Sequence, residues 1–256
     1  MDSDAPRSVA ADPGFVARHR VLARGYGHRP DPADPADVLA MPLVLHVPRS
    51  DPPARSSLLE AAAVATVTLC LDPRVGLGPD GEPGPWYGPF LAWNDARIRK
   101  VSRRARGAHW SAAQDVPGVT VDCDGAQARA LVPGRVGSLD SRISRLQIGG
   151  TDLPHDDAGD PPPGVPVLWV NADLDMTVGK AAAQVGHAAM LLAGALDVDA
   201  ARAWADAVFR CAVRDADPAR WKELVARAEA GTAVAVRDAG FTEVAPGSVT
   251  VIGTVS

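Results

Sequence analysis

The sequence is 256 residues long, with 46% hydrophobic and 22% charged residues. These values are typical of a globular protein and exclude a disordered or fibrous chain. The net charge of −5 conceals an uneven distribution. Residues 41–150 hold thirteen Lys and Arg against ten Asp and Glu, a net +3, whereas residues 165–256 hold eight against eleven, a net −3. The basic half of the chain is therefore the first half.

The cysteines, Cys70, Cys123 and Cys211, are odd in number and far apart, which fits neither a disulfide framework nor a zinc site. The acidic start of the chain lacks the features of a secretory signal. The longest apolar stretch, residues 58–71, contains Glu60 and is shorter than the about 20 residues of a membrane span. We expect a cytoplasmic protein that needs no metal or other cofactor.

Two segments have the composition of unfolded chain. Residues 1–40 are rich in Pro, Asp, Ala and Arg without a sustained apolar period, and we expect a mobile tail. Residues 153–164 contain a proline run and an acidic cluster, which predict an exposed, semi-rigid linker. The chain is thus expected to fold as two blocks, residues 41–152 and residues 165–256.

The second block alternates apolar runs of strand length with helical patterns. We predict strands over residues 165–171, 207–213, 232–237 and 248–255, and helices over residues 177–196 and 218–230. The order β-α-β-α-β-β predicts an α/β fold with a mixed, largely parallel, four-stranded sheet flanked by helices.

The first block repeats this plan with small changes of spacing. The matching pairs are residues 41–47 with 165–171, Glu60-Ala-Ala-Ala with Lys180-Ala-Ala-Ala, Trp93 with Trp204, Trp110 with Trp221, and Val132-Pro-Gly with Ala245-Pro-Gly. The matches occur in the same order, which favours an internal duplication. The alternative is two unrelated α/β domains whose tryptophans coincide.

Polar residues on the helix predicted over residues 177–196 share one face, because Lys180, Gln184 and His187 stand at i, i+4 and i+7. Such a stripe is often only the solvated side of a helix. Lys180, however, lies in the first turn, where unpaired N–H groups and the helix dipole already favour anions. A second polar segment, residues 238–248, is a long Gly- and Pro-containing turn between two predicted strands.

Residues 171–189 and 237–253 together resemble the two signature stretches of the type 2 peptidyl-tRNA hydrolases. The resemblance spans most of the second block and implies a mixed four-stranded sheet, a tRNA partner and hydrolysis of the ester between a peptide and tRNA. By the same resemblance, the catalytic positions are Lys180, His187, Asp238 and Thr242, and the substrate-binding positions are Gln184, Gly240 and Ser248.

Within this set, either Asp238 or His187 orients or deprotonates the water, and the sequence leaves the choice open. Lys180 offsets negative charge, and Gln184 and Thr242 donate hydrogen bonds. Asn171 and Phe241 stand where the family often has Arg, and Glu243 where it usually has Gln. Because these departures predict weaker tRNA contacts, a non-catalytic tRNA- or ribosome-binding module is the alternative. A third hypothesis is an esterase for another acyl-nucleotide.

The first block carries Glu60, Val64 and Val67 where the second has Lys180, Gln184 and His187. We therefore predict a non-catalytic copy that packs on the second block, giving a monomer with an internal pseudo-dimer. Its basic run, with a solvated charged face as the alternative, predicts contacts to the tRNA backbone. The residues of this run are Arg97, Arg99, Lys100, Arg103, Arg104 and Arg106.

Overall fold

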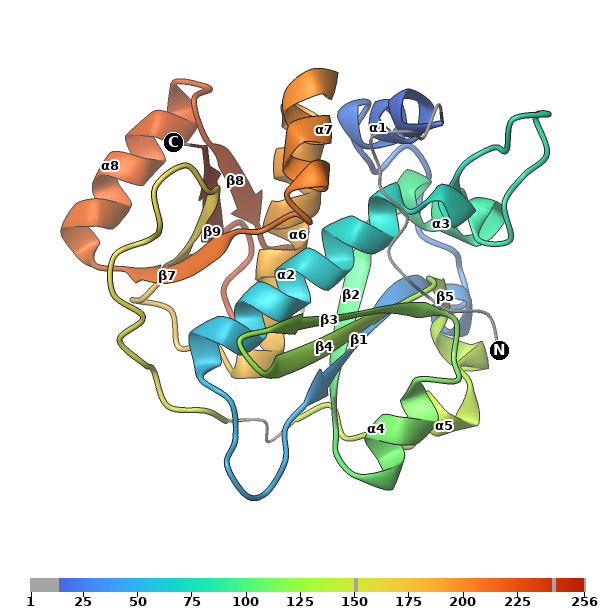
Figure 1. Cartoon of the computed structure of the whole chain (residues 1–256), viewed down its shortest axis with the longest axis horizontal. Coiled ribbons are helices and arrows are strands. Elements are labelled where there is room, and N and C mark those ends of the chain that lie inside the picture. Colours follow the sequence, from blue (N-terminus) through green and yellow to red (C-terminus); the bar gives the residue numbers. More distant parts are fainter. Residues whose placement is uncertain (1–13, 150–151, 241–242, 256) are drawn as a thin grey trace.

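The computed structural model describes residues 14–149, 152–240 and 243–255. Two β-sheets lie side by side, each built from one half of the chain (Figure 1). None of the helices in the described ranges is long and apolar enough to cross a membrane.

The first sheet has the strand order β2-β1-β4-β3, and β1 pairs in addition with the short strand β5. Strand β1 is parallel to β2 and antiparallel to β4. The strands are β1 (Leu39–His46), β2 (Arg99–Ala105), β3 (Gly118–Cys123), β4 (Ala126–Leu131) and β5 (Gly134–Arg135). The helices of this half are α2 (Arg55–Leu71), α3 (Tyr87–Asp95), α4 (Ala108–Ala113) and α5 (Ser141–Ser144), with 3-10 turns at Pro35–Asp37, Pro73–Val75 and Val136–Ser138.

The second sheet has the order β7-β6-β9-β8, and β6 is parallel to β7 and antiparallel to β9. The strands are β6 (Val167–Asn171), β7 (Ala212–Ala216), β8 (Val234–Arg237) and β9 (Val249–Thr254), and the helices are α6 (Val178–Ala195), α7 (Val198–Asp206) and α8 (Pro218–Glu229). The predicted mixed four-stranded sheet with helices is confirmed, but the expectation that it is largely parallel is wrong, because β8 returns beside β9 and both the β6–β9 and β8–β9 pairs are antiparallel. The first sheet has the same order and the same strand directions when β1, β2, β3 and β4 are matched to β6, β7, β8 and β9.

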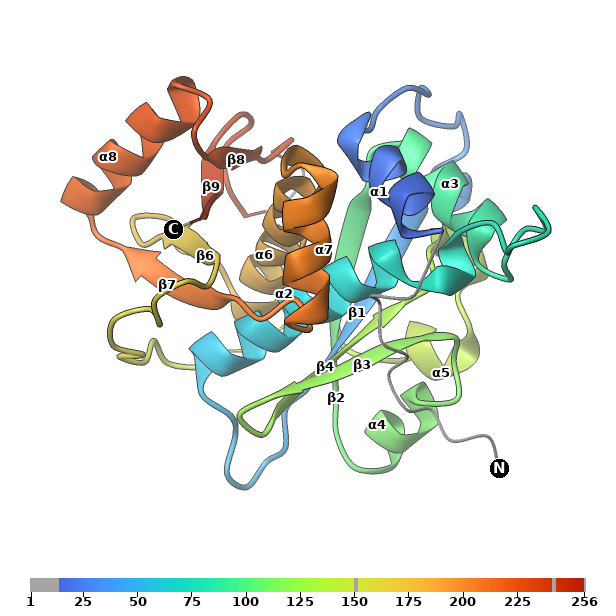
Figure 2. The ribbon, with the colours of Figure 1, turned by 45° about the horizontal axis from the view of Figure 1, so that its top comes forward.

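Helices α2 and α6 pack against each other between the two sheets (Figures 1 and 2). Their contact is close: a Cβ atom on Gly186 would lie 2.7 Å from Thr66 Oγ1. One hydrophobic cluster runs through this layer and includes side chains from both sheets, such as Leu43 and Leu168. The two halves therefore share a core, while α8 and the α4–α5 pair cover the outer faces with smaller clusters of their own.

The expected tail is folded from residue 15 onward, so this prediction is wrong for the described residues of the segment. Helix α1 (Phe15–Ala23) packs on α6 and α2, with the Phe15 side chain fully buried. Its Arg18 Nε donates to Leu71 O at 2.7 Å, and His19 Nε2 lies 3.0 Å from Ala193 O. These polar groups contact backbone carbonyls near the C-terminal ends of α2 and α6 that have no partner within their helices. The amino-acid composition of the segment does not reveal such contacts.

The segment predicted as a linker is mostly exposed, but it is attached to both halves. Asp156 accepts from Ser56 N at 2.8 Å and so caps the first turn of α2. His155 Nδ1 lies 2.5 Å from Asp215 Oδ2, and Arg214 Nε donates to Gly159 O. The linker therefore follows the surface rather than spanning open solvent.

One turn is repeated in the two halves. Trp93 Nε1 donates to Arg99 O at 2.9 Å, and Trp204 Nε1 donates to Arg210 O at 2.8 Å. The residue before each of these arginines has a positive φ, 46° at Ile98 and 54° at Phe209. Because this turn occupies residues 207–210, the strand predicted to begin at residue 207 begins at Ala212.

Candidate functional site

Helix α6 presents the polar stripe predicted from the sequence. Thr177 caps the helix, with its Oγ1 accepting from Lys180 N at 3.2 Å. Lys180 and Gln184 then stand one turn apart on the same face, toward the end of β8. The helix start thus places an ammonium group and an amide together at one edge of the second sheet.

Asp238, the residue after β8, accepts hydrogen bonds from both of these side chains. Lys180 Nζ lies 2.5 Å from Asp238 Oδ2, and Gln184 Nε2 donates to the same oxygen at 2.7 Å. The other oxygen, Oδ1, accepts from Gly240 N at 2.7 Å. Only 8% of the Asp238 side chain and 11% of the Lys180 side chain are exposed. The carboxylate is therefore an oriented, charge-paired group at a largely buried position.

The turn from β8 to β9 holds Asp238 from the backbone side. Asp238 N donates to Ser248 O at 2.9 Å, and Gly247 N donates to Asp238 O at 2.7 Å. Gly240 has a φ of +79°, and a Cβ there would lie 2.4 Å from Pro246 Cγ, so the position requires glycine. Ser248 takes part through its backbone in these contacts. Thr242 and Phe241 lie outside the described residues.

One residue of the site, Thr250, escaped the sequence analysis, and a second, Glu243, makes contacts that the sequence did not predict. Thr250 Oγ1 donates to Gln184 Oε1 at 2.7 Å, which fixes the amide so that its nitrogen faces Asp238. Thr250 is fully buried on β9, and a polar residue at an inward strand position is the signal that could have revealed it. Glu243, noted as a departure from the family pattern, accepts from Thr177 N at 2.8 Å and Thr177 Oγ1 at 2.9 Å. Its charge thus lies at the positive end of α6.

His187 faces the first half of the chain instead of hydrogen bonding to Asp238. Its Nδ1 lies 3.1 Å from the Nζ of Lys100, on β2. Burial, together with the charges of Lys100 and Lys180, holds the pKa of His187 well below its usual value. Of the predicted residues, the structure therefore joins Lys180, Gln184, Asp238 and Gly240 in one cluster and places His187 beside it, at the contact between the halves.

The described residues of the first half, 14–149, do not form such a cluster. Glu60, at the position aligned with Lys180, accepts from Val213 N and Arg214 Nη1, each at 3.0 Å, on the edge strand β7. The loop is also missing, because Asp124 and Gly125 alone separate β3 from β4. The alignment of Val132-Pro-Gly with Ala245-Pro-Gly is therefore wrong: the former follows β4, whereas the latter precedes β9.

The basic run on and beside β2 does not form one exposed surface. Lys100 and Arg103 are each only 9% exposed, which contradicts a role for either in gripping a tRNA backbone. Arg103 donates to Ser144 O and Leu146 O. Successive strand residues point to opposite faces, which a count of charges ignores. Of the others, Arg97 and Arg99 pair with Asp31, Arg104 bonds to Gln147, and Arg106 is half-buried.

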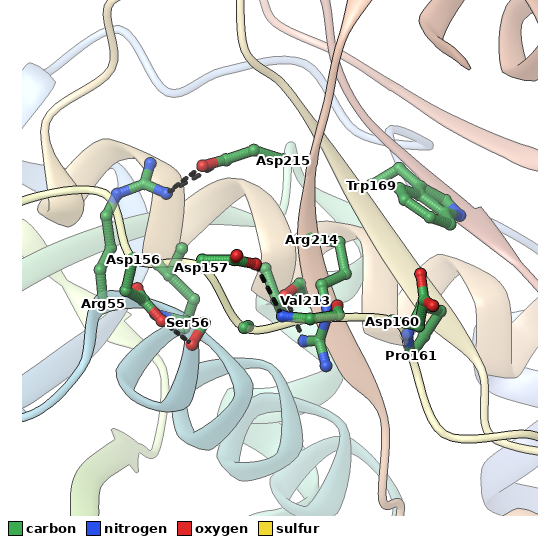
Figure 3. Close-up of a pocket in the computed structure, with 13 residues that line it drawn as sticks. Arg55, Ser56, Asp156, Asp157, Asp160, Pro161, Trp169, Val213, Arg214 and Asp215 are labelled. Carbon is green, nitrogen blue, oxygen red and sulfur yellow. Dashed lines mark hydrogen bonds and ion pairs between the residues drawn. The ribbon is translucent and has the colours of Figure 1, made fainter.

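A cavity of about 420 Å³ lies elsewhere, between the linker, the start of α2 and β7 (Figure 3). Two of its arginines are already paired, Arg55 with Asp215 at 3.2 Å and Arg214 with Glu60 at 3.0 Å. Across the described residues, no three His, Cys, Asp or Glu side chains are grouped as metal ligands would be.

The fold and the polar cluster together define a mixed-sheet α/β domain with a charge-paired polar cluster at one helix start and one loop. Residues 165–255 match the family model described as peptidyl-tRNA hydrolase PTH2, and this part of the chain is a domain of that family. The probable peptidyl-tRNA hydrolase 2 of Schizosaccharomyces pombe is 40% identical over 94 residues, 34% of this chain and 45% of that protein. The chain thus spans less than half of that relative. No solved structure gives a significant match.

Proposed function

We propose that the second half of the chain hydrolyses the ester bond between tRNA and a peptide or N-acyl-amino acid. The observation that carries this proposal is the buried Asp238 carboxylate, held by Lys180, Gln184 and the Gly240 N–H. Family membership of residues 165–255 and the name of the fission yeast relative support the same activity.

The geometry favours Asp238 as the group that activates water. Its Oδ2 already accepts two hydrogen bonds, whereas Oδ1 accepts one bond from the described residues and keeps capacity for a water proton. Water attack on the ester carbonyl would pass its proton to Asp238. The tetrahedral intermediate then expels the ribose hydroxyl, which recovers that proton.

Lys180 supplies the positive charge that this reaction needs. Its ammonium group lies against the carboxylate at the first turn of α6, where the helix dipole adds positive potential. It can stabilise the oxyanion of the intermediate or a phosphate of the tRNA end, and Gln184 keeps the carboxylate oriented. Thr242, by the family resemblance, is expected to donate a further hydrogen bond.

We also propose that the first half is a non-catalytic copy of the domain. The equal strand order, the repeated tryptophan turn and the α2–α6 contact support this origin. Glu60 and the two-residue turn at Asp124 and Gly125 leave that half without the lysine and the loop of the candidate site.

The test is release of peptide from an N-acylated aminoacyl-tRNA by the purified chain and by Asp238→Asn. Loss of a general base lowers the rate by roughly 100- to 10,000-fold. The kcat of Asp238→Asn should therefore be at least roughly 100-fold lower than that of the wild type. Asp206→Asn, an equivalent change at an exposed position of α7, is the control and should keep wild-type turnover. Bound tRNA without turnover by the wild type would refute the proposal in favour of an RNA-binding module.

A further inference from the structure

Lys100 is a lysine of the first half whose side chain ends against helix α6 of the second. Its Nζ lies 3.1 Å from His187 Nδ1 and 3.1 Å from Met190 Sδ, both on α6. The same nitrogen lies 4.9 Å from the ring centroid of Trp93. These three groups, an imidazole nitrogen, a thioether and a π face, each accept an interaction from an ammonium group.

The donor and acceptor of the Lys100–His187 contact follow from the chemistry of the ammonium group. An ammonium has three N–H donors and no acceptor, so His187 Nδ1 has to accept. A neutral imidazole carries one proton, and that proton then lies on Nε2. The Lys100 side chain is buried and that of His187 is partly buried, which limits the access of water to the contact.

The charge states agree with this direction. Burial lowers the pKa of Lys100 to about 7, and the interaction with Cys70 on α2 acts in the opposite direction. The pKa of His187 is held well below its ordinary value by burial and by Lys100 and Lys180. Below the pKa of Lys100, these directions favour an ammonium group that faces a neutral imidazole.

The contact is specific to one side of the pseudo-dimer. The residues aligned with His187 and Lys100 in the other copy are Val67 and Cys211, which cannot form such a pair. Burying a lysine without a carboxylate partner is costly. Lys100 is thus a buried cation of the first half that lies against the helix carrying the candidate site.

We propose that Lys100 is a positioning residue for the site of the other half, holding His187 in the Nε2–H tautomer. His187 then offers substrate a hydrogen-bond donor through Nε2, and Asp238 remains the base. This inference rests on the proposed function, and it makes the non-catalytic half a contributor to the site.

The tautomer is measured directly by ¹⁵N NMR of histidine side chains in the full chain at pH 6, with the His187 signals assigned by His187→Gln. We expect a protonated Nε2 and an unprotonated Nδ1. A wild-type signal from the Nδ1–H tautomer would overturn the role of Lys100, and this result needs no variant of Lys100.

Kinetics test whether the tautomer matters. Lys100→Met removes the donor and should lower kcat by roughly 10- to 100-fold, as loss of orientation does, with little change in KM and a mixed tautomer signal. Lys100→Gln restores a donor and should recover part of kcat. Lys222→Met, at an exposed position of α8, is the matched control and should match wild type.

The two proposals fail separately. A folded Lys100→Met with wild-type kcat and an unchanged His187 signal would refute the positioning role while the hydrolase activity stands. Absence of hydrolysis by the wild type would refute the proposed function and the kinetic part of this inference together.

Discussion

Lys100 gives the stability of the folded chain a pH dependence of its own. Its pKa is about 7 in the folded protein and 10.5 when unperturbed, so between these values the unfolded chain binds the proton more tightly. The free energy of unfolding therefore rises with pH in this window, by at most about 1.4 kcal/mol per pH unit for one proton.

Urea unfolding of wild type and Lys100→Met between pH 6.5 and 8.5 checks this expectation. The difference in unfolding free energy between the two proteins should shift in favour of wild type as pH rises. The range ends below 9.0, the ordinary value for a thiol, because burial raises the pKa of Cys70 to about 12 and would contribute the opposite slope. Parallel pH curves for the two proteins would contradict a depressed lysine pKa.

Single residues of the candidate site were predictable where sequence spacing fixes the geometry. Lys180 and Gln184 share a helix face whatever the tertiary arrangement. The loop motif that contains Asp238 was then sufficient to predict that the three side chains lie together. The partner of His187 was not predictable, because Lys100 is 87 residues away and reaches it through the packing of the two halves. Strand alternation alone already divides the basic run of β2 between two faces.

Among the elements, α1 shows most clearly how local composition can mislead. Phe15 is buried among side chains that lie far along the chain, and its removal leaves a cavity in the shared core. Phe15→Ala should lower the free energy of unfolding by about 3–5 kcal/mol. Arg20→Ala, at an exposed position of the same helix, should change it by less than about 0.5 kcal/mol.

Urea unfolding followed by circular dichroism measures both variants. Equal stability of Phe15→Ala and Arg20→Ala would show that α1 adds little to the core.

The register of the repeat could be determined only from the structure. Leu43 and Leu45 face the shared core as Leu168 and Val170 do, which corresponds to an offset of 125 residues. The sequence match placed it at 124, and a shift of one residue exchanges the two faces of a strand.

At the scale of the whole molecule, the first half covers the apolar side of α6. The residues that cover it, such as Thr66 at 2.7 Å from a Cβ on Gly186, belong to the same chain. We expect the full chain to scatter light as a monomer of 26.6 kDa. Residues 165–256 alone would expose this helix face and should self-associate.

Multi-angle light scattering of both proteins tests the arrangement. A full chain of twice the monomer mass, together with a stable monomeric fragment of residues 165–256, would contradict the internal pseudo-dimer. A fragment of residues 165–256 that remains monomeric but binds the separate first half would support the contact between the halves. It would also show that this contact forms without a covalent connection between them.

The contact of α1 with α6 also orders events during synthesis. His19 meets Ala193 across 174 residues of sequence, and a Cβ on Gly194 would lie 2.8 Å from the backbone of Leu22. Until a ribosome has made the first three quarters of the chain, the surface of α6 on which α1 docks is incomplete. Helix α1 emerges well before α6 but reaches its final place only after α6 has been made, and chaperones have access to its apolar face until then.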